Sequence, residues 1–469
     1  GDESRINTET LENRLCELTE LYFDSGTLSG VLETILDQAN PRFYANESPL
    51  PVSRTRYTDD DDYLQAMIAT IESLDESCLC IQGPPGAGKT FSAEKIIEKL
   101  VKDGKRVGIM SNSHAAIMNL LTELPGRLPD ASVVKVAYSP SLSIKEFHKI
   151  YTKDDFPNLD FRPSSSFTKK APYDGYDIIG ATVYCFSKDF CYESPLDVLF
   201  VDEASQVALA NLVAVTGAAK NIVLMGDQMQ LEQPIQGTHP DNAGKSALEF
   251  MLKGHSVIPD EQGLFLERTY RMHPKVCQPL SEIVYEGKLK SDKKTEIQSI
   301  NIDNPTLVTQ ANGILSISVQ HEDNTQSSEE EVIKVQQIID ELKTGTFTNN
   351  EGMVSPITDK NILIVAPYNM QVNLLKEKLK GDLKIGTIDK FQGQQAPVVI
   401  ISMAVSDVIE SSRGLDFVFD INRLNVAVSR AQALAIIVAN EGLEQCQVKS
   451  LGQMEKVGFY NRLISRNKY

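Results

Sequence analysis

The chain has 469 residues, of which 41% are hydrophobic and 23% are charged, and its formal net charge is −18 at pH 7. These values are typical of a globular protein with about two to four domains, and they exclude a chain coated in basic residues for nonspecific nucleic-acid binding. No apolar run is long enough to span a membrane and the first residues lack the basic flank of a signal peptide, so we expect an intracellular location, cytoplasmic if the chain is microbial.

Residues 1–60 are expected to form a helical lead-in and a linker that carry no chemistry of their own. A helix-like pattern extends to Leu36, after which three prolines interrupt it. From Tyr63 the apolar spacing favours an amphipathic helix, which would begin the first sheet domain.

A glycine-rich segment of the form G-x-x-x-x-G-K-T follows the apolar residues Cys78 to Ile81 and leads into a helix-compatible run. This order of strand, loop and helix distinguishes the motif from an accidental glycine turn: backbone N–H groups contact phosphate oxygens and the helix N-terminus favours negative charge. Lys89 is expected to reach the β- and γ-phosphates and the Thr90 hydroxyl to bind Mg²⁺. The sequence therefore predicts a nucleoside triphosphate site formed by Gly83, Pro84, Pro85, Gly86, Ala87, Gly88, Lys89 and Thr90.

Beyond this helix, Arg106 to Met110 is expected to be a buried strand, and the order strand, helix, strand predicts a parallel sheet. Residues 125–172 are rich in proline, serine and lysine and show no sustained periodicity, which indicates an inserted subdomain. The sheet is expected to resume at Ile178 to Thr182.

An acidic pair, Asp202 and Glu203, follows the apolar segment Asp197 to Val201. Such a pair is common by chance, but after a phosphate loop in a βαβ chain it favours the second half of a nucleotide-hydrolysis site. Asp202 would then hold Mg²⁺ through water, and Glu203 would accept a proton from the attacking water.

Two later segments carry polar residues whose interpretation depends on these motifs. Gln230 follows the strand Ile222 to Met225 and could sense the γ-phosphate, with an ordinary turn as the alternative. Tyr270 and Arg271 place a ring that can stack on a base beside a guanidinium that can bind phosphate, with an ordinary surface segment as the alternative. His273, which precedes a proline, is expected to be structural.

The second half repeats the alternation of strands and helices without a second phosphate loop. Apolar strands are expected at residues 314–319, 362–365, 398–401 and 435–438. This pattern predicts a second α/β sheet domain that completes the site of the first domain across a cleft. The expected domains are residues 61–270 and 271–469.

Taken in order, these segments resemble the motifs of superfamily 1 helicases, from about Tyr63 to about Asn440. The resemblance is strongest to the group that includes the nonsense-mediated-decay RNA helicase, the senataxin type and the replication nuclease–helicases. It implies an α/β fold of two RecA-like P-loop NTPase domains with parallel sheets, in addition to the inserted subdomain. The motifs that carry it are Gly83 to Thr90, Ser111 to Ala116, Gly180 to Thr182, Asp202 to Gln206, Gly226 to Leu231, Tyr270 to Pro274, Gly386 to Gln395 and Leu424 to Ala431.

In the nucleotide site, the resemblance implies that Thr90 and Asp202 hold Mg²⁺ for bound ATP. Tyr270 would stack on the base, Gln65 would read the adenine edge and Gln395 would contact the ribose. The implied catalytic residues, of which the two arginines act as fingers from the second sheet domain, are Lys89, Glu203, Gln230, Arg271 and Arg430. Seven further residues fall on motifs that line the single strand in this family: Asn112, His114, Thr182, Pro367, Tyr368, Thr387 and Asp389.

Three residues depart from the family pattern. Gln395 stands where Glu is usual, which changes the charge near the implied ribose contact. Gln228 stands where His is usual, and Ala87 replaces a common Thr or Ser. We expect Ala87 to be tolerated because backbone groups make most of the contacts of a phosphate loop.

The implied function is an ATP-dependent helicase or translocase on single-stranded nucleic acid, with DNA favoured over RNA and 5′ to 3′ polarity. The alternative is a nucleotide-gated ATPase that binds nucleic acid or a protein without unwinding. A small-molecule kinase would explain the phosphate loop but would leave Arg271, Arg430 and the second sheet domain without a role.

Two segments, Gln230 to Pro240 and the C-terminal part near Gln453 and Met454, are more similar to a microbial subgroup in which the helicase follows a RecB-like nuclease on one polypeptide. No such nuclease fits within residues 1–60. The resemblance therefore implies a nuclease domain or partner outside this chain.

Overall fold

The computed structural model describes residues 8–28, 30–44, 48–57, 59–137, 150–163, 175–231, 242–391, 393–407 and 414–465. The chain divides into two compact units. Unit 1 comprises Gly1–Gly83, Gly88–Gln228 and Glu232–Leu266. Unit 2 comprises Pro84–Ala87, Met229–Leu231 and Glu267–Tyr469. The tip of the phosphate loop and the segment around Gln230 thus belong to the same unit as the second half of the chain.

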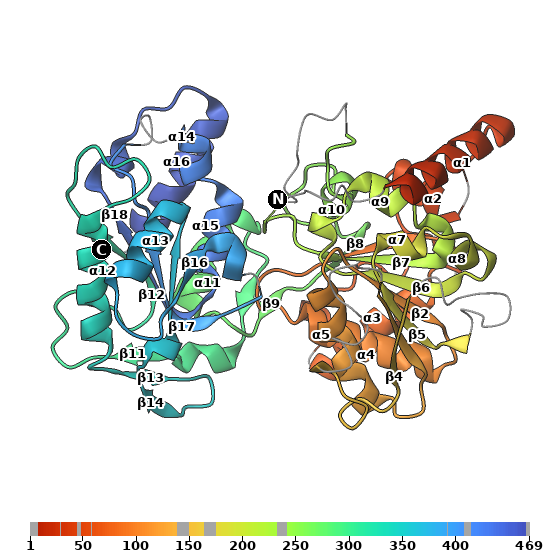
Figure 1. The fold of residues 1–469 in the computed structure, drawn as a ribbon, viewed down its shortest axis with the longest axis horizontal. Helices are drawn as coiled ribbons and strands as arrows, with labels where there is room; N and C mark the ends of the chain where they lie inside the picture. The colour runs from red at the N-terminus through yellow and green to blue at the C-terminus, as the bar shows by residue number, and fades with distance from the viewer. Residues whose placement is uncertain are drawn as a thin grey trace. The chain divides into compact units, whose positions relative to one another are not determined.

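Unit 1 is built on an eight-stranded sheet in the order β4-β3-β5-β2-β6-β7-β1-β8, in which each strand is parallel to its neighbours (Figure 1). β1 is buried along its whole length, because helices cover both faces of such a sheet and its strands can be continuously apolar. The strands are β1 (Cys78–Gln82), β2 (Val107–Met110), β3 (Val133–Ala137), β4 (Leu159–Pro163), β5 (Ile178–Ala181), β6 (Leu196–Val201), β7 (Ala219–Gly226) and β8 (Gly263–Phe265).

Helices lie on both faces of the unit 1 sheet (Figure 1). α3 (Asp60–Glu72), α4 (Lys89–Lys102) and α5 (His114–Arg127) lie on one face. The other face carries α7 (Val183–Phe186), α8 (Asp189–Glu193), α9 (Leu209–Val213) and α10 (Ala247–Met251). α2 (Gly30–Leu36) packs against β1 and β7, and α1 (Glu9–Ser25) precedes it. The direction of strand addition reverses along the chain, since β1, β2 and β3 succeed one another in one direction and β5, β6, β7 and β8 in the other. Because crossovers between parallel strands are right-handed as a rule, this reversal places helices on both faces of the sheet.

The segment 125–172, which we expected to form an inserted subdomain, instead contributes to the sheet in its described part. β3 and β4 come from this segment and pair in parallel at one edge of the eight-stranded sheet. The apolar residues Val133, Val134 and Val136 make β3 suitable for burial beside β5. Residues 138–149 and 164–174 lie outside the described ranges.

Unit 2 contains a five-stranded parallel sheet in the order β12-β18-β17-β15-β16 and a small antiparallel sheet of β11, β13 and β14. The main strands are β12 (Gly313–Ser318), β15 (Ile362–Ala366), β16 (Lys384–Thr387), β17 (Ala396–Ser402) and β18 (Ala431–Ala439). The short ones are β9 (Arg268–Thr269), β10 (Lys290–Ser291), β11 (Ser299–Asn301), β13 (Thr346–Thr348) and β14 (Val354–Pro356). The helices are α11 (Pro274–Val284), α12 (Glu329–Leu342), α13 (Asn369–Lys378), α14 (Gly414–Val418), α15 (Ile421–Val428) and α16 (Leu451–Ser465).

α12 shows how the sequence specifies these elements. The Ser328 hydroxyl caps its N-terminus by accepting the Glu331 N–H, and three glutamates in the first turn complement the helix dipole. Its buried residues Val332, Val335, Ile338, Ile339 and Leu342 recur every three or four positions and join the core of the parallel sheet.

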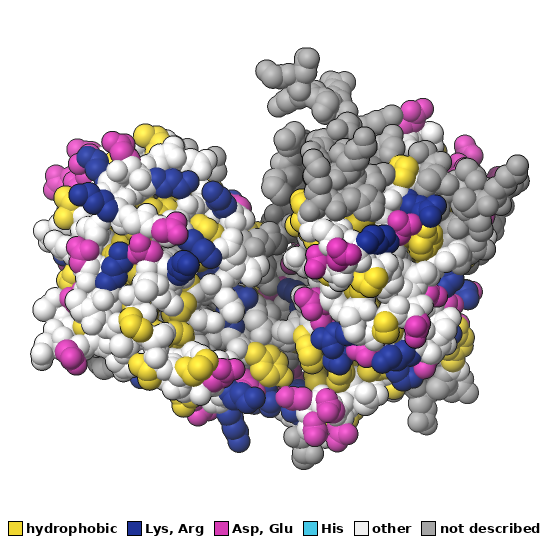
Figure 2. Space-filling view, turned by 60° about the horizontal axis from the view of Figure 1, so that its bottom comes forward, with side chains coloured by type: hydrophobic (Ala, Val, Ile, Leu, Met, Phe, Trp, Pro, Cys, Tyr) yellow, Lys and Arg dark blue, Asp and Glu magenta, His cyan; other side chains and the backbone are white. Residues whose placement is uncertain are grey.

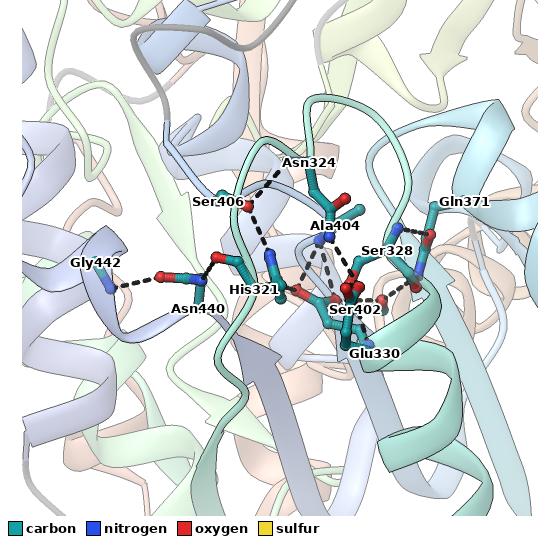
Figure 3. Close-up of polar contacts among 11 residues, drawn as sticks. His321, Asn324, Ser328, Glu330, Gln371, Ser402, Ala404, Ser406, Asn440 and Gly442 are labelled. Carbon is teal, nitrogen blue, oxygen red and sulfur yellow. Dashed lines mark hydrogen bonds and ion pairs between the residues drawn. The ribbon is translucent and has the colours of Figure 1, made fainter.

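A buried polar network fixes the start of α12 against the carboxyl end of β17 (Figure 3). The fully buried carboxylate of Glu331 accepts hydrogen bonds from Ser402 Oγ at 2.6 Å and from the Ala404 N–H at 3.0 Å. His321 Nε2 lies 3.1 Å from the same carboxylate, and His321 Nδ1 lies 2.7 Å from Ser406 Oγ. Since His321 follows β12, these contacts hold the segments after two strands of the sheet together.

The two helix-covered parallel sheets confirm the predicted α/β class with two RecA-like domains. None of the helices in the described ranges is long and apolar enough to cross a membrane.

Candidate active site

The phosphate loop lies between the end of β1 and the first turn of α4, as the sequence predicts. Gly86 and Gly88 have φ angles of 73° and 80°, a left-handed backbone that favours glycine. A Cβ on Gly83 would lie 2.1 Å from Lys89 Cγ, so the absence of a side chain at this position makes room for Lys89. The Lys89 ammonium donates to the Gly83 carbonyl at 2.9 Å, and Lys89 and Thr90 are the first two residues of α4.

The loop tip makes backbone contacts within unit 2. The Thr269 hydroxyl donates to the Pro85 carbonyl at 2.9 Å, and the Tyr270 N–H donates to the Gly86 carbonyl at 2.9 Å. A Cβ on Gly86 would lie 2.5 Å from Arg271 Cβ. The loop tip and the start of the Tyr270 to Pro274 motif are therefore in direct contact. Thr269, which is fully buried, was not identified from the sequence.

Asp202 and Glu203 follow β6 directly. The Asp202 N–H donates to the Met110 carbonyl at 2.8 Å, and the Glu203 N–H donates to Asp202 Oδ1 at 2.9 Å. Glu203 has a φ of 54° and a ψ of 44°, a left-handed conformation that non-glycine residues adopt mainly where the surrounding structure imposes it. The pair lies at the carboxyl end of β6, where hydrolysis would need it.

The adjacent carboxyl groups of Asp202 and Glu203 favour a bound cation. Burial and the charge of Glu203 raise the pKa of Asp202 to about 7, and the positive charge of Lys89 opposes this rise. The Asp202 carboxylate and the Thr90 hydroxyl supply the hard oxygen ligands that Mg²⁺ prefers. These residues therefore fit the Mg²⁺ that the sequence predicts.

Gln228 and Gln230 follow β7 in different settings. The Gln228 amide donates to the Ser256 carbonyl at 2.6 Å and to the His255 carbonyl at 3.2 Å, so the residue that replaces the usual His binds backbone within unit 1. Gln230 is buried in unit 2. The adjacent Met229 carbonyl accepts a hydrogen bond at 2.7 Å from the buried amide of Asn425, a residue to which the sequence assigned no role.

Arg271 and Arg430 come together in unit 2. The Arg271 Nε donates to Gln395 Oε1 at 2.7 Å, and its Nη1 donates to the Ser429 carbonyl at 3.1 Å. Arg430, which is 3% exposed, donates from Nη1 to the Gln394 carbonyl at 3.4 Å. Burial, together with the charge of Arg430, lowers the pKa of Arg271 to about 9. Both predicted fingers are thus held by consecutive residues of the Gly386 to Gln395 motif.

The residues assigned to the adenosine part of ATP occupy separate units. Tyr270 lies in unit 2 with 45% of its surface exposed, which leaves the ring accessible for stacking. Gln65 is exposed on α3 in unit 1, two residues after Tyr63, whose hydroxyl donates to the Phe265 carbonyl at 3.4 Å. Gln395, assigned to the ribose, contacts Arg271 instead.

In unit 1, the predicted strand-binding residues follow two neighbouring strands, β2 and β5. The Asn112 amide donates to the Gln206 carbonyl at 2.5 Å. His114 is the first residue of α5, and burial together with the charge of Lys135 lowers the pKa of its imidazole. Thr182 precedes α7. Because the carboxyl ends of parallel strands share one edge, these residues gather at one edge of the sheet.

In unit 2, the predicted residues likewise follow the neighbouring strands β15 and β16. Pro367 and Tyr368 come after β15, Thr387 ends β16, and Asp389 lies in the turn that follows. Tyr368 is only 4% exposed, and its ring lies 5.2 Å from that of Phe417. Arg423 stacks 4.5 Å from the Phe417 ring and lies 3.5 Å from Asp389. Phe417 and Arg423 thus link two predicted residues, and sequence spacing gave no signal for either.

The described surface carries charges of both signs. On the face shown in Figure 2, Lys and Arg side chains are interspersed with Asp and Glu. This mixture is consistent with the net charge of −18. The region Gln230 to Pro240, which resembles a microbial subgroup, lies outside the described ranges from residue 232 onward.

Two family models, each described as an AAA domain, match the chain, one over residues 66–235 and the other over residues 243–442. Among solved structures, arterivirus nonstructural protein 10 (helicase) in complex with DNA is similar, with a TM-score of 0.41 at 14% identity over 77% of this chain and 60% of that chain.

Curated relatives are similar over most of the chain. The putative helicase mov-10-B.1 of Danio rerio is 26% identical over 76% of this chain and 39% of its own length. The DNA replication ATP-dependent helicase/nuclease dna2 of Schizosaccharomyces pombe is 24% identical over 83% of this chain and 28% of its own length. The regulator of nonsense transcripts 1 homolog of Drosophila melanogaster is 26% identical over 79% of this chain and 34% of its own length. This chain therefore spans between 28% and 39% of the length of these relatives.

Proposed function

We infer that this chain, which belongs to the superfamily 1 helicases, is an ATP-hydrolysing motor that acts on single-stranded nucleic acid. The observation that carries the proposal is the contact between the phosphate-loop tip and the segment that bears Arg271, through the Pro85 and Gly86 carbonyls. An arginine placed beside a phosphate loop can stabilise the charge that develops on the transferred phosphoryl group.

The proposed roles follow from the chemistry of each side chain. Lys89 binds the β- and γ-phosphates, Glu203 accepts the proton of the attacking water, and Gln230 contacts the γ-phosphate. Arg271 and Arg430 stabilise the transition state. Mg²⁺, held by Thr90 and Asp202, supplies charge neutralisation on the phosphate oxygens when bound. We also propose that Tyr270 and Gln65 contact the base.

We propose that the strand lies on the residues that follow the sheet strands, with DNA favoured over RNA and 5′ to 3′ polarity. These residues are Asn112, His114, Thr182, Pro367, Tyr368, Thr387 and Asp389. The name of one relative, a DNA replication helicase/nuclease, supports DNA and a nuclease domain or partner outside this chain. An intracellular location and the domain limits 61–270 and 271–469 belong to the same proposal.

ATP hydrolysis measured with and without single-stranded DNA or RNA tests this function. We expect stimulation by a single strand, and a larger effect of DNA. A protein that hydrolyses ATP at one rate with and without every strand would refute the motor.

A second candidate is a nucleotide-gated ATPase that binds nucleic acid or a protein without unwinding. The interspersed charges of Figure 2 favour it, because phosphate contacts from Lys and Arg supply most nonspecific strand affinity. A strand-displacement assay separates the two: ATP-dependent release of a labelled strand supports the helicase, and stimulated ATPase without release supports the gated ATPase.

A further inference from the structure

Gln395 occupies the position at which the family resemblance implies a ribose contact, but the structure gives its side chain a different partner. Its Oε1 accepts a hydrogen bond of 2.7 Å from Arg271 Nε. The Ser429 carbonyl accepts a second bond of 3.1 Å from Nη1 of the same guanidinium. Two acceptors on different N–H groups fix both the position and the plane of a guanidinium.

These two acceptors are neutral, since one is an amide oxygen and the other a backbone carbonyl. They therefore orient Arg271 while its full charge stays available to a phosphate. The preceding carbonyl, that of Gln394, accepts from Arg430 at 3.4 Å, and the Ala396 N–H donates to the Arg430 carbonyl at 3.1 Å. Residues 394–396 thus contact both arginines proposed to act on the transferred phosphoryl group.

We propose that Gln395 is a positioning residue for Arg271, holding its guanidinium through Nε in the orientation that stabilises the transition state of ATP hydrolysis. This inference rests on the proposed function. The two roles predict different kinetic effects. A positioning residue stabilises the transition state and therefore affects kcat, whereas a ribose contact strengthens ATP binding and therefore affects KM.

Single-turnover and steady-state ATPase measurements on Gln395→Ala distinguish these roles. We expect kcat to fall at least about tenfold, with ATP affinity and KM changed less than about twofold. Gln395→Glu should recover only part of kcat, because a carboxylate oxygen can accept the same Nε–H bond but offsets part of the guanidinium charge. The control is Gln336→Ala, which removes a half-buried glutamine bonded to Asp340 on α12 and should leave kcat unchanged.

A double-mutant cycle tests whether Gln395 acts through Arg271. If it does, Arg271→Ala combined with Gln395→Ala is as slow as Arg271→Ala alone. If the fold-losses in kcat of the two single variants multiply in the double variant, the proposal is overturned. It is also overturned by a Gln395→Ala protein with normal kcat, a raised KM and a lost preference for ATP over 3′-deoxy-ATP, which would establish the ribose contact. Failure of the wild-type protein to hydrolyse ATP refutes the proposed function itself.

Discussion

At the scale of single residues, the chain separates binding of the nucleotide from its hydrolysis. Lys89 projects from the first turn of α4, whereas Glu203 sits in a left-handed backbone at the end of β6. One residue offers a fixed positive charge and the other a proton acceptor. Substitutions at the two positions should therefore fail in different ways.

Glu203→Gln should retain ATP binding and reduce turnover by at least about 100-fold, because the amide cannot accept the proton of the attacking water. Lys89→Ala should weaken ATP binding by about tenfold or more, because it removes a charged donor to the phosphates. Equilibrium binding of a fluorescent ATP analogue and ATPase rates measure both. Normal hydrolysis by Glu203→Gln would show that another group is the base.

Gly86→Ala tests the contact between the loop tip and Arg271. The added Cβ would lie 2.5 Å from Arg271 Cβ in addition to requiring a φ of 73°, so the loop or the arginine must move. We expect ATPase activity to fall by about 100-fold, the usual effect of a displacement of about 1 Å at a reacting centre.

Gly104→Ala is the matched control for Gly86→Ala. Gly104 has a φ of 76° but open space around its Cβ position. It should lose about 1 kcal/mol of stability from backbone strain and keep its ATPase activity. Equal loss of activity in both variants would attribute the effect at Gly86 to backbone strain alone.

At the scale of secondary-structure elements, two buried charged side chains influence stability without a place in the proposed chemistry. Lys135 lies on β3 with 0% exposure, and its ammonium donates to the Val136 carbonyl at 2.9 Å. Glu331 lies in the first turn of α12 and is also fully buried. We expect Lys135 to lower the stability of the fold and Glu331 to increase it.

Burial lowers the pKa of Lys135 to about 8, below the value of about 10.4 expected in the unfolded chain. Between these two values the unfolded chain binds more protons, so the free energy of unfolding should rise with pH. Lys135→Met should increase that free energy at pH 7 by about 2 to 3 kcal/mol and remove this part of the rise. Urea denaturation at several pH values measures both effects.

The control for Lys135→Met is Lys220→Met, which removes an exposed lysine paired with Asp197. We expect it to change stability by less than about 1 kcal/mol. A Lys135→Met protein no more stable than wild type at pH 7 would contradict the burial of the charge.

Glu331→Gln should destabilise unit 2 by about 2 to 4 kcal/mol. The carboxylate accepts hydrogen bonds from Ser402 and Ala404, and an amide would present a donor to one of these donors. Thermal denaturation followed by circular dichroism measures the loss. The control is Glu329→Gln, at an exposed residue of the same turn, whose stability should lie within about 0.5 kcal/mol of wild type. If Glu329→Gln loses as much stability as Glu331→Gln, the buried hydrogen bonds of Glu331 are not the cause.

At the scale of the whole molecule, the features that were predicted from the sequence are those that depend on residues close together in the chain. The apolar strands and the strand, loop and helix around Gly83 to Thr90 are local patterns, and both parallel sheets are found as predicted. β3 and β4 were not predicted as part of the sheet, because the polar segment between them hides their periodicity.

Contacts between distant segments were beyond sequence reasoning. Gln395 and Arg271 are 124 residues apart, and Asn425 and Met229 are 196 apart. The motifs name such residues individually, but only the folded sheets decide which polar groups meet. The ribose role of Gln395 was therefore inferred without knowledge of its nearest partner.

The space that Gly83 leaves for Lys89 makes these two positions epistatic. A methyl group at position 83 would collide with the lysine stem at 2.1 Å, and Leu266 lies 3.2 Å from the same point. Gly83→Ala should therefore be much more harmful to folding in the wild-type chain than in Lys89→Ala, where the stem is gone. A lineage that lost the lysine could afterwards fill position 83, and it could not then regain the lysine in a single substitution.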